Sequence, residues 1–160
     1  MVNSTRPLTT TRVFVCSHCG RCCEKIFVHL DGGQWAQPVT AGLLLLPGEQ
    51  HLFPHTTPMW RSGAEVLAYQ MDREPCPHWT GKGCAIYNRR PLACRAYPVW
   101  WEIVWRADTN CPQVTAVGQL GEYREEITSA HDILRFQRWL YAMHKDLEYF
   151  DLTERVWKRV

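Results

Sequence analysis

The stretch CSHCGRCC, residues 16–23, places four thiols within eight residues in the pattern C-x2-C-x2-C-C. Four more cysteines follow singly, which brings the total to eight, the number that two four-thiolate metal sites would use. A metal-free cluster of thiols this dense would oxidise readily and pack poorly. We therefore interpret the pattern as metal-binding, with these candidate ligands: Cys16, Cys19, Cys22, Cys23, Cys76, Cys84, Cys94 and Cys111.

The composition is that of one folded domain. The chain has 160 residues, and its 46% apolar content is enough for a hydrophobic core without covalent staples. We predict a single domain over residues 1–160, with a metal-binding region over 14–113 and a C-terminal helix over 120–150. The expected fold class is α+β, with short strands and helices around the metal, followed by the long helix.

The charge and the N-terminal sequence indicate which compartment and which classes of partner to expect. Residues 1–15 lack the cationic start and apolar run of a signal peptide, so a reducing cytoplasm is expected, where thiols stay free unless a metal binds them. The longest apolar run, residues 41–46, is too short to cross a membrane. A net charge of +2 gives no field that would attract nucleic acid. Neither a membrane nor nucleic acid is an expected partner.

Turn-forming residues divide the chain into short elements. Gly81, Lys82 and Gly83 predict a turn that brings Cys84 back towards Cys76, and Pro91 suits the start of a short helix carrying Cys94. The other expected elements are a loose arm (1–12), a strand (13–15), a turn at Gly32-Gly33, a helix over 41–46 capped by Thr40, an irregular loop (47–63) and strands over 65–71 and 99–106.

Beyond residue 122 the apolar spacing becomes helical. The intervals are 3-4-3-4-3, over Ile133, Phe136, Leu140, Met143, Leu147 and Phe150. A stripe of this kind must be covered. We favour packing on the domain's own core, and the alternative is a homodimer or a partner helix.

The spacing of the cysteines does not decide which metal they bind. Thiolates select zinc, iron in clusters and cuprous copper. Structural zinc sites usually combine two C-x2-C pairs, and the later cysteines, C-x7-C-x9-C, lack such a pair. Three thiols from one loop with a fourth from a distant Cys-Pro would instead bind a [4Fe-4S] cluster. The expected cofactor is therefore an iron-sulfur cluster or Zn²⁺.

The loop thiols Cys16, Cys19 and Cys22 fit the cluster pattern, and both Cys76 and Cys111 are followed by proline. Neighbouring residues on a regular backbone point in different directions. Cys22 and Cys23 therefore either serve two neighbouring metals, or one of them is a spare thiol, and Cys23 should behave differently from the other three. His18 and His78 are the alternative ligands, although a place beside the site or on the surface is expected for both.

Taken together, these motifs resemble the CxxCxxCC family of zinc- or iron-chelating proteins, also called the YkgJ-like cysteine cluster family. The resemblance covers roughly residues 14–113 and implies metal chelation by the cysteines, in a family whose biological role is largely undefined. The chain departs from the family at His78, where members often have an aromatic residue. The matching positions are Cys16, Cys19, Gly20, Cys22, Cys23, Cys76, Cys84, Ile86, Tyr87, Arg90, Pro91, Cys94, Arg95, Tyr97, Pro98 and Cys111.

Three functions are compatible with these residues. A metal-binding module without catalysis of its own comes first, with Arg90 and Arg95 either offsetting the charge of the site or forming ordinary salt bridges. The second is an enzyme or a component of one, because the resemblance extends to flagellin lysine methylases. No glycine-rich G-x-G-x-x-G loop accompanies it, and little chain remains for a cosubstrate domain. The third, a zinc module for nucleic acid, lacks a basic face.

Overall fold

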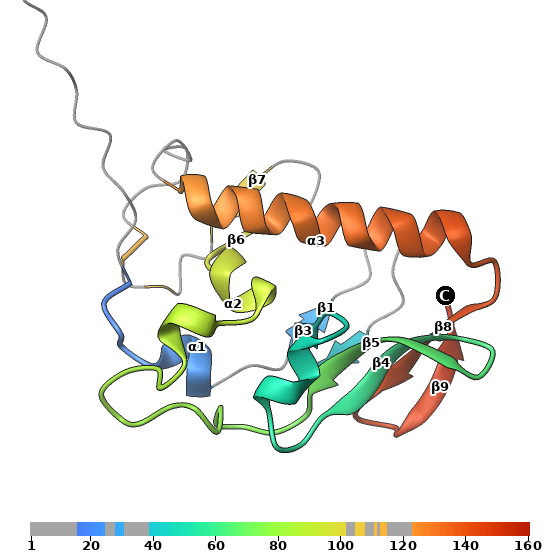
Figure 1. Cartoon of the computed structure of the whole chain (residues 1–160), viewed down its shortest axis with the longest axis horizontal. Coiled ribbons are helices and arrows are strands. Elements are labelled where there is room, and N and C mark those ends of the chain that lie inside the picture. The colour runs from blue at the N-terminus through green and yellow to red at the C-terminus, as the bar shows by residue number, and fades with distance from the viewer. Residues whose placement is uncertain are drawn as a thin grey trace, which may run out of the picture.

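The protein folds as a five-stranded antiparallel sheet beside one long helix, which confirms the α+β class (Figure 1). The computed structural model describes residues 16–24, 28–30, 39–101, 105–107, 111, 113–114 and 123–160. Predictions for the arm at 1–12, the strand at 13–15 and the turn at Gly32-Gly33 lie outside these residues. None of the described helices is long and apolar enough to cross a membrane.

The elements are short except for the last helix. The α-helices are α1 (Arg21–Glu24), α2 (Leu92–Ala96) and α3 (Arg124–Met143), and the 3₁₀ helices are η1 (Glu49–Leu52) and η2 (Tyr87–Arg89). The strands are β1 (Val28–Leu30), β2 (Val39–Ala41), β3 (Leu43–Leu45), β4 (Thr57–Ser62), β5 (Glu65–Met71), β6 (Val99–Trp101), β7 (Trp105–Ala107), β8 (Leu147–Asp151) and β9 (Val156–Arg159).

The main sheet has the strand order β3-β5-β4-β8-β9, so strands from the end of the chain complete a sheet begun near its start. The buried amide of Gln70 on β5 ties these parts together. Its Oε1 accepts the Gly42 amide at 2.8 Å, and its Nε2 donates to the carbonyls of Pro58 at 3.0 Å and Phe150 at 3.2 Å. Because Gln70 is fully buried, losing these partners would leave a desolvated amide.

The predicted strand over 65–71 is confirmed as β5, but the irregular loop predicted over 47–63 is wrong. This stretch contains η1 and the central strand β4. Proline at a central position is tolerated because the ladder shifts register between Pro58 and Trp60, and β8 pairs only with the part of β4 from Trp60 onward. A turn at Gly63, which has a φ of +57°, then leads from β4 into β5.

The helix predicted over 41–46 is also wrong, because β2 and β3 occupy this run. An apolar run this short fits a buried strand as well as a helix, and pairing of β3 with β5 decides for the strand. Gly42 makes the close approach possible, since a Cβ there would lie 2.0 Å from the Met71 carbonyl oxygen. No other residue could bring β3 this close to β5.

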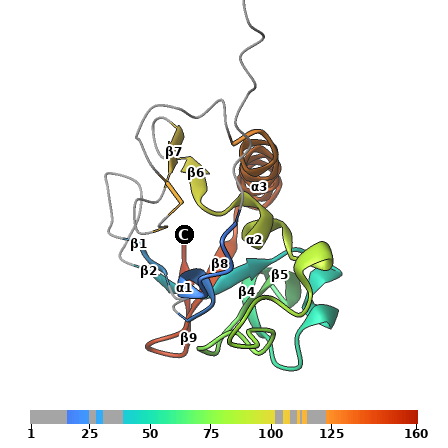
Figure 2. The same cartoon turned by 90° about the vertical axis from the view of Figure 1, so that its left-hand side faces the viewer.

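Helix α3 packs on the core of its own domain, which confirms the arrangement that we favoured over a homodimer or a partner helix. Towards its start, Tyr123, Ile127 and Ala130 pack with Ala96 and Val99. Further along, Leu140 is 1% exposed and packs with Leu67 of β5 and Leu147 of β8. The helix runs along one side of the molecule, with the paired strands β6 and β7 beside it (Figures 1 and 2).

Two predicted elements end earlier than the sequence pattern suggested. Helix α3 stops at Met143 instead of residue 150, because Leu147 and Phe150 enter β8 and pair with β4 and β9. Their helical spacing is accidental, and the ladder imposes a period of two instead. The described part of the strand predicted over 99–106 forms two antiparallel strands, β6 and β7, in which Trp101 pairs with Trp105.

Replacing Leu140 by alanine tests whether α3 is held to the sheet. We expect Leu140→Ala to lower the free energy of unfolding by about 2–5 kcal/mol, because it opens a cavity between Leu67 and Leu147. Chemical unfolding measures the change. The matched control is Met143→Ala on the same helix, where a side chain 64% exposed should cost about 0.5 kcal/mol or less. Equal losses for both variants would contradict this packing.

Candidate metal centre

The cysteine loop owes its shape to two residues with left-handed backbone. His18 has a φ of +56° and Gly20 a φ of +82°, and helix α1 then carries Cys22 and Cys23. Two local bonds hold the turn: the His18 amide donates to Cys16 Sγ at 3.4 Å, and the Cys23 amide donates to the Gly20 carbonyl at 2.8 Å. The predicted tight point at Gly20 is therefore confirmed.

Gly20 is required by a neighbour as well as by its own conformation. A Cβ at this position would lie 2.3 Å from the ring of Trp79, closer than any real contact. The ring thus packs directly on the loop backbone and covers it, because Gly20 is buried while Ser17, His18 and Cys19 around it are exposed. The sequence pattern did not single out Trp79, and its position three residues after Cys76 is the only signal that it carries.

The later cysteines lie on a compact framework, as their turn signals predicted. Trp79 and Cys84 form a β-bridge, with Gly81 at a φ of +82° in the turn between them. The Ala85 amide donates to the His78 carbonyl at 2.9 Å, which brings Cys84 back alongside the segment that carries Cys76. Cys94 lies on the predicted short helix, α2, directly after Pro91.

The two parts of the candidate site meet at Cys23 and Cys76. The Cys76 amide donates to the Cys23 carbonyl at 2.7 Å, which joins α1 to the second segment. At the same junction the Cys23 thiol is hydrogen-bonded to the sulfurs of both Cys22 and Cys76. Three of the eight predicted ligands therefore interact here, although 52 residues lie between Cys23 and Cys76 in the chain.

 The chain between these two cysteines, residues 24–75, contains β3, β4 and β5 of the main sheet, so the sheet brings them together.

The shared hydrogen bonds shift the pKa values of the three thiols in different directions. Because the Cys23 thiol donates to its neighbours, it stabilises their thiolates and lowers the pKa of Cys22 to about 7 and that of Cys76 to about 6. The pKa of Cys23 is raised by the same two bonds. At neutral pH the junction thus offers thiolate, the form of cysteine that binds metals.

The remaining thiols have other surroundings. Burial raises the pKa of Cys84, Cys94 and Cys111, and Cys84 and Cys94 lie within electrostatic reach of Cys22 and Cys76. Cys111 lies within reach of Cys19 and Cys22 instead. The structure gives Cys16 one contact in its own loop, the amide of His18.

An apolar layer lies beneath the junction. Cys23, Cys76 and Cys84 pack against a core cluster that includes Leu45, Phe53, Met71 and Ile86. Cys76 is 9% exposed, whereas Cys19 and Cys22 are exposed on the loop side. The candidate site therefore has one face against the core and one towards solvent.

The two candidate histidines have other partners. His78 Nε2 lies 2.6 Å from the Leu52 carbonyl oxygen, and its ring packs edge-on against Phe53. The His18 ring lies 4.7 Å from that of Tyr87, centroid to centroid. Sequence reasoning also missed Glu126, a buried carboxylate in the first turn of α3 whose pKa is raised by burial and which the charge of Arg90 reaches.

The donor set fits a thiophilic metal, because all eight cysteines are free and the junction thiols are partly ionised. The geometry is not that of a closed site. Among the residues that the structure describes, no three Cys, His, Asp or Glu side chains are arranged so that they could hold an ion. Binding a metal would require the exposed loop thiols to move closer to Cys76, Cys84 and Cys94.

Comparison with known protein families gives a match over most of the described cysteine region. The model of the CxxCxxCC family, described as a proposed zinc- or iron-chelating domain, matches residues 15–112, which include all eight cysteines. No curated protein and no solved structure matches the chain significantly.

Replacing Gly20 by alanine tests the contact with Trp79. We expect Gly20→Ala to destabilise the protein by about 1–3 kcal/mol more than Gly81→Ala, because only Gly20 combines a left-handed φ with a blocked Cβ position. Gly81 is the matched control, since it has the same φ of +82° and open space around its Cβ position. Thermal unfolding of both variants measures the difference, and equal losses would show that the ring does not constrain the loop.

Proposed function

Because the chain belongs to the CxxCxxCC family, we propose that its cysteines bind zinc or iron where the cysteine loop meets Cys76. The observation that carries this proposal is the Cys23–Cys76 junction. A backbone hydrogen bond fixes the two segments there, and Cys23 shares hydrogen bonds with the sulfurs of Cys22 and Cys76. Sulfurs that already share protons are close enough for a small movement to let one ion replace those protons.

The two parts of the site have different tasks in this proposal. Cys76, Cys84 and Cys94 lie on the folded framework and would provide fixed ligands, while the loop over residues 16–23 would close over the metal. Thiolates at Cys22 and Cys76 can bind directly, and Cys23 releases its proton on binding. A metal bound there would supply either a structural cross-link or, as a [4Fe-4S] cluster, a redox centre.

We further propose that the protein handles metal or transfers electrons and does not catalyse a reaction of its own. The solvent-exposed thiols Cys19 and Cys22 support this, because they leave one edge of the site open to a donor or acceptor. A purely structural zinc site is usually closed by its own four ligands. This role suits a reducing compartment such as the cytoplasm, where the thiols would stay free for metal.

Metal analysis of anaerobically purified protein tests the proposal. We expect zinc or iron at one or more atoms per chain. Iron with inorganic sulfide, a brown colour and a reversible one-electron reduction would identify a [4Fe-4S] cluster, whereas colourless protein with zinc would exclude redox chemistry at the site.

Chelation completes this test, because metal binding and folding are coupled in small thiolate sites. Removing the metal should lower the melting temperature, and adding it back should restore it. Protein purified without either metal, and unable to take up either on reconstitution, would refute the proposal.

Serine substitutions test which thiols act together. From the junction we expect Cys23→Ser and Cys76→Ser to lose similar amounts of metal, and the double variant to lose no more than either, because coordinated ligands act as a unit. The loop spacing predicts a different grouping, in which Cys16→Ser is as severe as Cys22→Ser and Cys23→Ser is mild. Metal-to-protein ratios for the four single variants distinguish the two groupings.

A further inference from the structure

The ring of Tyr87 contacts two charged or titratable side chains from different parts of the site. The His18 ring lies 4.7 Å from it, and the Arg90 guanidinium carbon lies over it at 3.8 Å from its centroid. Arg90 is fixed a second time, because its Nε donates to the Tyr87 carbonyl at 2.8 Å. We call His18, Tyr87 and Arg90 the Tyr87 cluster.

The Tyr87 cluster joins the two parts of the candidate site. His18 belongs to the cysteine loop and holds a left-handed φ of +56° there, which is costly for a residue with a side chain. Tyr87 belongs to the framework, where its amide donates to the Cys84 carbonyl at 3.2 Å. A second framework contact lies close by, since a Cβ on Gly83 would be 3.5 Å from His18 Nδ1. The His18 ring therefore rests on the segment that carries Cys84.

Arg90 carries the positive charge of the Tyr87 cluster, and this charge acts on the nearby thiols. It is half-buried, and its charge acts on Cys22, Cys84 and Cys94, which come from three different elements of the site. A divalent ion held by four thiolates leaves a net charge of about −2. A cation fixed beside such a site would offset part of that charge, and its partial burial reduces the screening by water.

We propose that Tyr87 is the positioning residue of the metal centre: its ring holds the cysteine loop through His18 and holds Arg90 where its charge offsets that of the metal-bound thiolates. This inference rests on the proposed function and deepens it. A purely structural role for the cluster would affect the metal-free and metal-bound protein alike. A role towards the metal must change metal retention more than it changes the stability of the metal-free fold.

The experiment measures how fast excess chelator removes the metal from the protein as purified. Arg90→Gln should lose its metal about 10-fold faster than the wild type, the scale on which partners behind the ligands act. The matched control is Arg89→Gln, which removes the same charge from the exposed neighbouring residue and should retain metal as the wild type does. Arg90→Lys keeps the charge but loses the Nε hydrogen bond to the Tyr87 carbonyl, so its metal loss should rise by less than the 10-fold expected for Arg90→Gln.

The ring is tested in the same assay. Tyr87→Phe keeps the platform and should behave as the wild type, whereas Tyr87→Leu removes it and should accelerate metal loss about 10-fold. Thermal unfolding of the metal-free variants serves as the second readout. In that measurement Arg90→Gln and Arg89→Gln should have the same melting temperature.

The outcomes separate this inference from the proposed function. Wild-type protein that contains neither zinc nor iron as purified, and takes up neither on reconstitution, refutes the proposed function itself. Wild-type protein with metal, but with equal retention in Arg90→Gln and Arg89→Gln, overturns the inference alone, as does metal loss in Arg90→Gln that matches a loss of stability without metal. If Arg90→Gln does not fold, Arg90→Lys decides, because a 10-fold faster loss in that variant would show that the charge is not what matters.

Discussion

The hydrogen bond from the Cys76 amide to the Cys23 carbonyl, 2.7 Å long, is the contact on which the candidate metal centre depends. It joins a four-residue helix that could not persist alone to a framework that the main sheet supports. Once it is made, the thiols of Cys22, Cys23 and Cys76 must lie together, and their hydrogen bonds and acidity follow from that proximity. The packing of Trp79 on Gly20 reinforces the same junction from its side.

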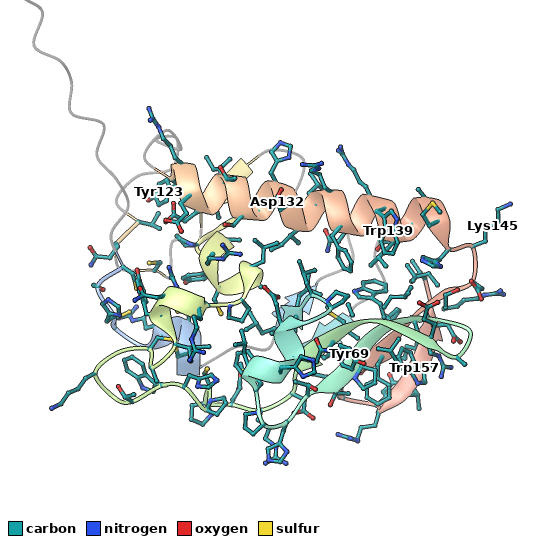
Figure 3. The ribbon with its side chains drawn as sticks, in the orientation of Figure 1. Tyr69, Tyr123, Asp132, Trp139, Lys145 and Trp157 are labelled. Atoms are coloured by element: carbon teal, nitrogen blue, oxygen red, sulfur yellow. The ribbon has the colours of Figure 1, made fainter. Side chains whose placement is uncertain are left out.

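The framework depends in turn on a part of the chain outside the family match. Strands β8 and β9 and the whole of α3 complete the sheet and core that carry the cysteine segments, and Gln70 links β5 to β8 through the Phe150 carbonyl. Figure 3 shows Tyr123 at the start of α3 and Trp139 near its end, so that the helix spans from the region of α2 to the outer strands. The metal-binding motif thus rests on a scaffold of which its own sequence supplies only β3, β4 and β5 of the main sheet.

Several elements could be predicted because their signals are local. The strand at 65–71, the turn at 81–83 and the helix after Pro91 follow from β-branched residues, glycine and proline acting within a few positions. The elements that were mispredicted depend on distant partners. Leu43–Leu45 is a strand because β5 lies beside it, and α3 ends at Met143 because Leu147 enters a ladder with β4. Apolar spacing cannot distinguish these cases.

The sequence by itself determined the chemistry of this protein: eight thiols in a spacing that belongs to a metal-chelating family, on a chain with enough apolar residues for one core. That much is a matter of residue type and local spacing. Tertiary structure alone decided which thiols meet, that Cys23 lies between Cys22 and Cys76, and that Tyr87 bridges His18 and Arg90. The contacts of Cys23 with Cys76 and of Tyr87 with His18 join segments with β3, β4 and β5 between them in the chain, and they depend on strand pairing and core packing between residues far apart in the chain.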